Sequence, residues 1–471
     1  MKGTKYLFKN IGLLTISQFG TKLLSFFLVP LYTYVLSTSE YGTYDIYNTT
    51  VSLLLPILTL NISDATLRFS LNNKKQEKAV FSIGIKYTII AVILATGIIG
   101  LNSKFGFIDT IRQYAVFLVI MFVNNSFNIL LSNFARGIDC VKEVAISGVI
   151  CSVMMLSLNI LFLLPLNLGL NGYFLANIIG TFSQVIYLFV SIKAWRYFDI
   201  KLMHSPIQHS MLNFSRPLIL NSVAWWINSA SDRYVVVWLC GVSANGIYSV
   251  ANKIPSILNI FQTIFNQAWT LSAVYDFDSE DKNGFFTRVY NLYNFSMVLV
   301  CSVLIVLTKV IAHFLFAKEF YLAWKYAPFL MLSVVFGALS GYIGGIFSAV
   351  KDSKIFAKTT LYGAVVNIVL NIVLVYKFGA IGAAIATTVS YGMVWLMRII
   401  IVKKYINLKI NFLRDVTAYC ILVLQCIVLL LIRSANVVLY SVEIVLAVVI
   451  LLLFSSQIKI LLNKLKMMVK R

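Results

Sequence analysis

The sequence predicts an all-α integral membrane protein with about 14 transmembrane helices, and three observations support this prediction. Of the 471 residues, 60% are apolar and 12% are charged, which is about half the charged fraction that is usual in a soluble domain. Apolar runs of about 20 residues, the length that crosses a bilayer, recur along the whole chain. Lys and Arg residues gather in the links on one side of these runs, which is the positive-inside pattern of membrane proteins.

The apolar runs, separated by short polar breaks, are the candidate transmembrane helices. In chain order, we expect these helices near residues 11–36, 44–66, 80–101, 114–134, 144–166, 170–192, 217–240, 246–271, 289–316, 326–349, 357–376, 380–402, 412–433 and 437–461. The longest links, at 68–78, 193–216 and 276–288, lie on the basic side, whereas several links on the other side are very short. The net charge of +22 therefore follows from topology and from contact with anionic lipid rather than from nucleic-acid binding, and both termini are predicted in the cytoplasm.

The first apolar run is predicted to be a membrane helix rather than a cleaved signal peptide. Residues 1–10 are basic and precede the run at 11–36, an order that signal peptides share. However, the run is too long for a signal peptide, contains Lys22 and lacks a cleavage site of small residues.

The second half of the chain repeats features of the first half at a shift of 204 residues. This shift maps residues 42–48 onto 246–252, and polar residues at spacings of four and seven share one face of each helix. Facing lipid, such stripes would leave polar groups without partners, so we expect them to face each other or water. A repeat of six helices, an even number, gives two pseudo-symmetric six-helix bundles in parallel orientation. The predicted parts are a bundle at 1–205, a second bundle at 206–405, and a C-terminal helix pair with a basic cytoplasmic tail at 406–471.

Prolines lie inside three predicted spans, at Pro30, Pro56 and Pro255. Proline removes a backbone hydrogen bond and bends a helix. Bent helices in the two bundles fit hinges for alternating access, and they fit static kinks packed in place equally well.

Glycine pairs mark tight turns late in each half. Gly169 and Gly172 follow an apolar run in the first half, and Gly379 and Gly382 do so in the second. In each case we expect one helix to end and the next to begin within a few residues.

Two adjacent charges inside the span at 217–240 form the leading candidate for a functional site. Asp232 and Arg233 stand side by side in a membrane helix, where charge is expensive, so by default they mark function. We expect Asp232 to pair with Lys22 or Arg233, or to exchange a proton. The alternative is a purely structural salt bridge between the bundles.

Lys22 is the second charged candidate. It lies near the middle of the first span, and Gln18 shares its helical face. An ammonium at that depth is too far from water to snorkel easily, so it is expected to line a wet cavity or bind an anion. Structural pairing is again the alternative. Lys253, in the outer half of the span at 246–271, is a weaker candidate for the same role.

The remaining candidates line the cavity or lie near the ends of spans. The polar residues expected to line the cavity are Gln18, Asn48, Ser52, Asn228, Asn252 and Asn259. Lys86, Lys309 and Glu443 lie closer to span ends, where long side chains snorkel toward water. Asp64 and Arg68 are spaced i, i+4 and are expected to form an ion pair.

The sequence shows no chemistry for an enzyme. It contains no nucleotide-binding loop, no metal-ligand spacing and no large soluble domain, and its six cysteines lack paired spacing. We therefore expect a membrane transporter with no catalytic residue, no metal site and no cofactor.

Short motifs along nearly the whole chain carry a resemblance to a known family. They are Tyr-Gly-Thr-Tyr at 41–44, Leu-Arg-Phe at 67–69, Ser-Asp-Arg at 231–233 and Gly-Ile-Tyr at 246–248, together with the Gly-x-x-Gly turns. With these motifs, the chain resembles the polysaccharide repeat-unit (O-antigen, Wzx-type) flippases. That family belongs to the multidrug/oligosaccharidyl-lipid/polysaccharide exporter superfamily.

The resemblance implies a transporter of the bacterial cytoplasmic membrane. It would move undecaprenyl-pyrophosphate-linked oligosaccharide from the cytoplasmic to the periplasmic leaflet by alternating access, for O-antigen or capsule synthesis. Such a flippase has a cation-lined cavity between two bundles, a role that Lys22, Arg233 and Lys253 fit. A polysaccharide polymerase and a chain-length regulator are the implied partners, and proton or sodium coupling through Asp232 is a hypothesis.

Other functions remain as alternatives. A cation-coupled drug or toxin extruder would need acidic residues in the cavity, whereas the predicted cavity charges are mainly basic. A lipid II-type flippase handles a related undecaprenyl-linked glycan, and the sequence does not separate the two. A membrane polymerase would need a sizeable outer loop, and none is present among the predicted links.

Overall fold

The computed structural model of the chain describes residues 26–71, 74–106, 108–275, 277–350, 352–432 and 436–459. These residues form helices and connecting turns, with no strand in the described ranges. Nine of the helices are long and apolar enough to cross a membrane, or up to ten if one bent pair counts as a span. The predicted class, an all-α membrane protein with many spans, is confirmed, and this count is consistent with about 14 spans for the whole chain.

The chain divides into two compact units, Met1–Tyr234 and Val235–Arg471. The border falls inside one long helix, α9 (Ile207–Cys240). The division into parts at 1–205, 206–405 and 406–471 stays a prediction.

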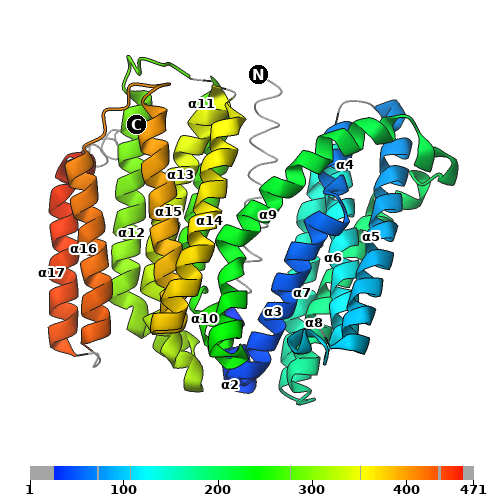
Figure 1. The fold of residues 1–471 in the computed structure, drawn as a ribbon, viewed down its shortest axis with the longest axis horizontal. Helices are drawn as coiled ribbons and strands as arrows, with labels where there is room; N and C mark the ends of the chain where they lie inside the picture. Colours follow the sequence, from blue (N-terminus) through cyan, green and yellow to red (C-terminus); the bar gives the residue numbers. More distant parts are fainter. Residues whose placement is uncertain are drawn as a thin grey trace, which may run out of the picture. The chain divides into compact units, whose positions relative to one another are not determined.

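The first unit is a bundle of helices that run roughly along one direction (Figure 1). Its elements before α9 are α2 (Val29–Val35), α3 (Thr38–Leu58), α4 (Ile62–Ser70), η1 (Lys74–Gln76), α5 (Glu77–Phe105), η2 (Asp109–Ile111), α6 (Ala115–Gly137), α7 (Val141–Leu163), α8 (Gly169–Ser191), η3 (Ala194–Arg196) and η4 (Ile200–His204). Helix α6 packs against α4, α5 and α8, and α8 packs against α7. Aromatic and aliphatic side chains such as Phe81, Phe134 and Leu188 fill the space between them.

Helix α3 begins and ends for identifiable reasons. At its start, the Ser37 hydroxyl accepts the backbone N–H of Glu40 while the Glu40 carboxylate accepts that of Ser37, which is a capping box. Pro56 lies inside its last turn, and Leu60 and Asn61 then adopt left-handed backbone conformations with φ of 54° and 50°. Helix α4 resumes after a bend of 60°. The predicted span at 44–66 is therefore a broken helix, and the break follows the proline.

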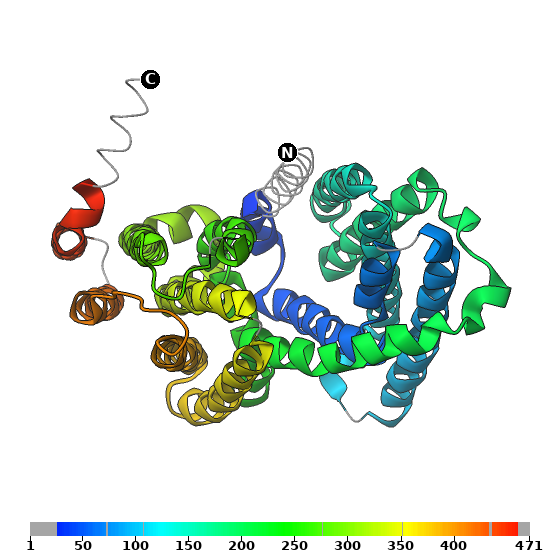
Figure 2. The same cartoon turned by 90° about the horizontal axis from the view of Figure 1, so that it is seen from above.

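The second unit is built around a buried helix, α13. Its elements are α10 (Val242–Ala251), α11 (Pro255–Tyr275), α12 (Phe285–Leu315), η5 (Lys318–Lys325), α13 (Ala327–Ala349), α14 (Ser353–Phe378), α15 (Ala380–Val402), α16 (Phe412–Leu431) and α17 (Val437–Leu453). Helix α13 packs against α11, α12 and α15, and Trp269 of α11 stacks on Tyr342 of α13 with ring centroids 4.2 Å apart. Seen from above, α16 and α17 lie side by side at the edge of this unit (Figure 2).

The predicted span at 246–271 is also broken. Helix α10 ends at Ala251, and α11 begins at Pro255 after a short turn. Proline suits the first turn of a helix, where its missing N–H would have no intrahelical partner. Two of the three predicted membrane helices with an internal proline, those at 44–66 and 246–271, are thus interrupted rather than smoothly bent.

The predicted glycine turns are confirmed. Gly169 and Gly379 have φ of 53° and 68°, values that glycine adopts without strain. At Gly382, an added Cβ would lie 2.1 Å from the carbonyl oxygen of Leu374, so only glycine allows α15 to start this close to α14.

The start of α14 is capped outside the membrane span. The Asp352 carboxylate accepts the Tyr405 hydroxyl at 2.8 Å and the backbone N–H of Ile355 at 3.2 Å. Both bonds favour the ionised carboxylate and lower the pKa of Asp352, and the bond from Tyr405 has the larger effect.

Candidate functional site

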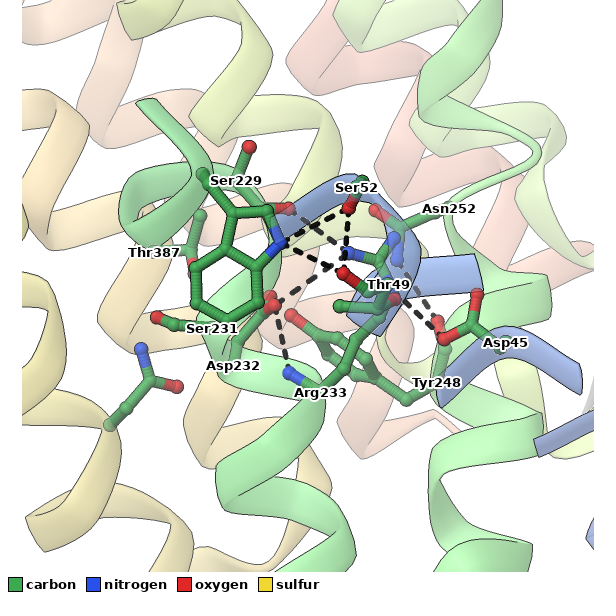
Figure 3. Close-up of polar contacts among 12 residues, drawn as sticks. Asp45, Thr49, Ser52, Ser229, Ser231, Asp232, Arg233, Tyr248, Asn252 and Thr387 are labelled. Atoms are coloured by element: carbon green, nitrogen blue, oxygen red, sulfur yellow. Dashed lines mark hydrogen bonds and ion pairs between the residues drawn. The ribbon is translucent and has the colours of Figure 1, made fainter. Parts of the chain in front are cut away.

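Arg233 of α9 is held against α3 by an acidic partner within the first unit. Its Nε lies 3.0 Å from Oδ2 of Asp45, and its Nη1 donates to the carbonyl oxygen of Ser229 at 3.1 Å (Figure 3). The neighbouring Asp232 is more distant, with 3.9 Å between its Oδ1 and Nη1 of Arg233. Asp45 therefore compensates the charge of the guanidinium. The side chain of Arg233 keeps 17% of its surface exposed.

A ladder of polar contacts continues along α3 and α9. The indole Nε1 of Trp226 donates to the carbonyl oxygen of Thr49 and to the hydroxyl of Ser52, both at 3.1 Å. The hydroxyls of Thr50 and Tyr234 lie 2.5 Å apart. Because no water is present in a bilayer core, polar groups on a membrane helix need such partners. The polar stripe predicted on α3 is therefore used, at least in part, to attach α9.

One more contact of this kind lies at the break between α3 and α4. The amide Nδ2 of Asn61 donates to the Ser222 hydroxyl of α9 at 2.9 Å. The side chain of Asn61, a residue with a left-handed backbone, thus bonds to α9 next to the break.

A cavity of about 340 Å³ lies beside this break, and we call it the polar cavity because polar side chains contribute to its wall together with Leu55, Pro56, Ile62 and Ile129. Its polar lining includes Ser52, Thr59, Ser63, Asp64, Ser126 and Ser222. At about 30 Å³ per molecule, the volume corresponds to roughly ten waters or to a small hydrophilic group. The cavity lies within the first unit, so the polar interior that the sequence places between the two bundles stays a prediction.

Asp64 is connected through an amide to a half-buried arginine. Its Oδ1 accepts Nδ2 of Asn133 at 3.3 Å, and Oδ1 of Asn133 in turn accepts Nη2 of Arg136. The predicted pair with Arg68 is wrong, because no ion pair joins Arg68 to Asp64 among the described residues and Arg68 is exposed. The Asp64 carboxylate accepts from Asn133 of α6 instead.

A second, apolar cavity of about 520 Å³ lies on another side of α3. Leu53, Leu54, Ile98, Leu101 and Ile111 supply much of its lining, with Trp226 and Tyr234 at its wall. In the first unit, α3 thus separates a polar cavity from an apolar one. A sugar fits the chemistry of the first, and an alkyl or prenyl chain fits that of the second.

The other predicted site residues of the first unit have separate surroundings. Asn48 is an exposed residue of α3, one turn from both Asp45 and Ser52. Asn228 is buried, and its Nδ2 donates to the carbonyl oxygen of Ala224 in its own helix at 2.9 Å. The structure therefore groups Ser52, Arg233 and Asp232 with Asp45, while Asn228 makes a local bond. Gln18 and Lys22 lie outside the described residues.

The predicted residues of the second unit flank the break between α10 and α11. Lys253 lies in the break and is half-buried. Asn252 donates from Nδ2 to the carbonyl oxygen of Tyr248 at 3.1 Å, and Asn259 is half-buried on α11. Their roles stay predictions.

Sequence reasoning missed Asp45 and Trp226. Asp45 is an acid inside a predicted span, seven residues before Ser52, and its charge at that depth is the signal that points to it. Trp226 is the position that matches Lys22 in the repeat, and its indole N–H is a donor that needs a partner when buried. An inventory of every donor and acceptor inside the spans would have found both residues.

Two of the three side chains predicted to snorkel do not reach water. Lys309 is 2% exposed and Glu443 is fully buried, so the snorkelling prediction is wrong for both. Their helices pack against other helices at that depth and cover the path to the surface. Lys86 instead bonds to the carbonyl oxygen of Met203 and to Gln208, at 3.3 Å and 3.1 Å.

Comparison with known proteins shows to which family this chain belongs. Residues 7–270, more than half of the chain, match the family described as polysaccharide biosynthesis protein, and residues 217–373 match the MatE family. The chain therefore belongs to the polysaccharide biosynthesis protein family, as the sequence motifs predict. These families place it among the polysaccharide flippases of the exporter superfamily and class it as a membrane transporter rather than an enzyme.

Particular relatives agree with this class. The chain is 23% identical over 211 residues to the probable low-salt glycan biosynthesis flippase Agl15 of Haloferax volcanii, a match that covers 43% of the chain and 44% of that protein. The fold is similar to that of the lipid II flippase MurJ in an inward closed conformation, with a TM-score of 0.69 and 18% identity over 94% of this chain and 98% of that one. An inward-facing multidrug resistance MATE family transporter gives a TM-score of 0.68 and 13% identity over 82% of this chain and 95% of that one. At such identities, the two structures show the shared fold alone.

Proposed function

We propose that the chain is a flippase for lipid-linked oligosaccharides. It moves undecaprenyl-pyrophosphate-linked repeat units across the bacterial cytoplasmic membrane by alternating access, for O-antigen or capsule synthesis. The observation that carries the proposal is the guanidinium of Arg233, held by Asp45 in a chain of the polysaccharide biosynthesis protein family.

The chemistry of such a substrate supports this reading. A pyrophosphate in a medium of low dielectric needs a compensating cation, and arginine offers a planar fork of donors that matches phosphate oxygens. In the resting arrangement, Asp45 stands where an anionic group would bind. The substrate phosphate replaces the Asp45 carboxylate as the partner of the guanidinium, so the guanidinium always has an anionic partner in the membrane. Lys22 and Lys253 remain proposed as further cationic contacts, and Asp232 as a coupling residue for protons or sodium ions.

The two cavities of the first unit suit the other parts of the substrate. The polar cavity beside Asn61 and Asp64 offers hydroxyl and carboxylate partners for sugar hydroxyls. The apolar cavity is suited to the prenyl chain. We further propose that both termini are cytoplasmic and that a polymerase and a chain-length regulator act on the product.

Two alternatives share the fold. The match to the MatE family over residues 217–373 favours a drug or toxin extruder, for which the acids Asp45, Asp64 and Asp232 would bind cations. A lipid II-type flippase would use the same cationic chemistry on another glycan. The test must therefore identify the molecule that is transported, because a loss of growth alone does not distinguish these functions.

The test uses a strain whose surface polysaccharide depends on this chain. Arg233→Ala removes a charge-assisted contact worth about 1.5–3 kcal/mol, so export is expected to fall about tenfold or more. Lipid-linked repeat units then accumulate inside the cell at unchanged protein level, and Arg233→Lys restores part of the export. Arg216→Ala, an exposed arginine of the same helix, is the matched control and is expected to export normally.

A double variant separates substrate binding from structural pairing. If Arg233 binds the substrate, Asp45→Ala/Arg233→Ala exports no better than Arg233→Ala alone. If the pair is only a salt bridge, removing both charges relieves the unpaired carboxylate and restores export, which overturns the role of Arg233. Changed drug resistance with normal surface glycan would favour the drug or toxin extruder. Accumulated lipid II would favour the lipid II-type flippase.

A further inference from the structure

Helix α17 buries a glutamate where its pattern calls for an apolar residue. Its buried residues are Leu439, Glu443 and Ile450, at spacings of four and seven, so they form one stripe on the helix. The residues on either side of the glutamate, Val442 and Ile444, are 37% and 53% exposed. The helix therefore turns its apolar side chains outward and its acid inward, which is the reverse of what hydrophobicity alone would produce.

The carboxyl group of Glu443 has Gln425 and Lys309 as its polar neighbours in the part of the chain that the structure describes. The side chain is fully buried, and neither carboxyl oxygen has a hydrogen-bond partner at normal geometry among the described residues. Helices α16 and α12 pack against α17 at this position. The buried Gln425 of α16 donates its Nε2 to the backbone carbonyl oxygen of Glu443 at 3.3 Å, and its own Oε1 is also without a partner in the part of the chain that the structure describes.

The positively charged side chain near Glu443 is that of Lys309, and it bonds to a different group. Lys309 of α12 is 2% exposed, and its Nζ donates to the carbonyl oxygen of Ile432 at 2.6 Å. The same Nζ lies 4.4 Å from the ring centroid of Trp324. Ile432 caps the C-terminal end of α16, where the helix dipole favours a positive charge.

Among the described residues, an ionised carboxylate here would be supported only by the Gln425 amide and by the ammonium of Lys309, which already donates to Ile432. Burying a charge without hydrogen bonds in a membrane helix is far more costly than burying the neutral acid. A bound sodium or calcium ion would need five or more oxygen ligands and would stand close to an ammonium, so it does not fit. A proton is the one cation that this site accommodates.

We propose that Glu443 is a proton-binding site of the C-terminal helix pair. With the proton bound, the neutral acid lies beside Gln425 while Lys309 holds the end of α16. On release, the carboxyl O–H bond breaks and the proton passes to water, while the ammonium keeps its own protons and turns from Ile432 toward the new carboxylate. One proton thus decides whether Lys309 binds α16 or α17.

Few other groups act on this site. Lys309 from α12 and the thiol of Cys426 from α16 are the titratable groups that interact with Glu443, and Cys301 of α12 interacts with Cys426. Buried thiols in apolar surroundings stay neutral. His313 lies one turn beyond Lys309 and is exposed. The proposal concerns proton binding alone and does not depend on which substrate is carried.

Infrared spectroscopy of the purified full chain in lipid bilayers tests the proposal directly. Glutamate labelled with ¹³C at its carboxyl carbon identifies the C=O stretch of a protonated side chain. At neutral pH, the wild-type chain is expected to show this band, Glu443→Gln to lose it, and Glu280→Gln, an exposed glutamate of a loop, to keep it. If the wild-type chain shows no band that Glu443→Gln removes, Glu443 is ionised and the proposal is overturned.

Two further variants keep the test decisive. Should Glu443→Gln fail to fold, Glu443→Asp in the chain labelled at glutamate removes the labelled band just as well. Lys309→Met removes the competing ammonium, so the band is expected to persist to a pH higher by about one unit or more. An unchanged pH midpoint in Lys309→Met would exclude the exchange of Lys309 between the two helices. Because no substrate is added, a failure of the proposed transport function leaves these outcomes unaffected.

Discussion

At the scale of single residues, Arg398 shows how a charge is buried in this fold with neutral partners. The side chain is 2% exposed, and it donates to Thr359, Thr360 and the carbonyl oxygen of Ser340 at 3.0 Å, 2.9 Å and 2.8 Å. Its guanidinium carbon lies 4.4 Å from the ring centroid of Phe356. These contacts join α15 to α14 and α13.

The geometry of this arginine, rather than its charge, is expected to matter. Arg398→Lys keeps the buried charge but loses the fork of donors, so it should destabilise the fold by about 3 kcal/mol or more. Arg398→Met removes the charge, and the hydroxyls of Thr359 and Thr360 keep their own bonds to Ile355 and Phe356. We therefore expect the unfolding temperature of the purified protein in detergent to fall further for Arg398→Lys than for Arg398→Met.

The control for this series is Lys403→Met, an exposed position just beyond the same helix, which should melt like the wild type. A methionine variant less stable than the lysine variant would show that the positive charge itself is required.

The sequence predicts site residues only where the free-energy cost of a residue depends on its own position in a helix and not on tertiary packing. The expense of charge in a membrane helix singles out Asp232 and Arg233 from the sequence alone. The partner of Arg233 could not be derived, because the pairing with Asp45 depends on how α3 and α9 pack. For the same reason Lys309 and Glu443 were expected at the surface, since distance from a span end does not reveal which helix covers a side chain.

At the scale of elements, the long apolar helices and the glycine turns followed from the sequence, whereas the breaks did not. Pro56 and Pro255 correctly marked two disturbed spans. Their sequence spacing does not reveal that the chain stops and restarts, because a proline helix can also bend without breaking. The left-handed Leu60 was beyond prediction, since a leucine rarely adopts positive φ.

The glycine turn between α14 and α15 gives a sharp test of element packing. Gly382→Ala would place a Cβ 2.1 Å from the backbone oxygen of Leu374, and backbone cannot move aside as a side chain can. We expect a loss of about 2 kcal/mol or more in stability, seen as a lower melting temperature.

The matched control is Gly97→Ala, a helical glycine of α5 with nothing within 4 Å of the added carbon. Alanine favours helix over glycine by about 1 kcal/mol, so this variant should melt at the wild-type temperature or above it. Equal losses in both variants would mean that helix α15 tolerates a shift away from α14.

At the scale of the whole molecule, composition and charge pattern were sufficient to predict the class. Apolar length sets the spans and basic links set the orientation, and neither depends on tertiary contacts. The number of spans and the grouping into bundles depend on packing, which is why the predicted three-part division remains open.

The predicted orientation can be measured with cysteines introduced one at a time. Lys75→Cys lies in a link assigned to the cytoplasm, and Asn167→Cys lies in a turn assigned to the outside. A maleimide that cannot cross membranes should label Asn167→Cys in intact cells and Lys75→Cys only after permeabilisation. The unmodified chain, with its six native cysteines, provides the background. Labelling of Lys75→Cys in intact cells would reverse the assigned topology.

The shared helix α9 has a consequence for how this protein can be divided. The border between the compact units, after Tyr234, falls inside a 34-residue helix. A gene split there would cut the helix, and a split ahead of α9 at Ser205 would take Trp226 and Arg233 away from their partners on α3. Two separately made fragments would each lack part of their own fold. We therefore expect that two fragments split at the midpoint do not fold independently of each other.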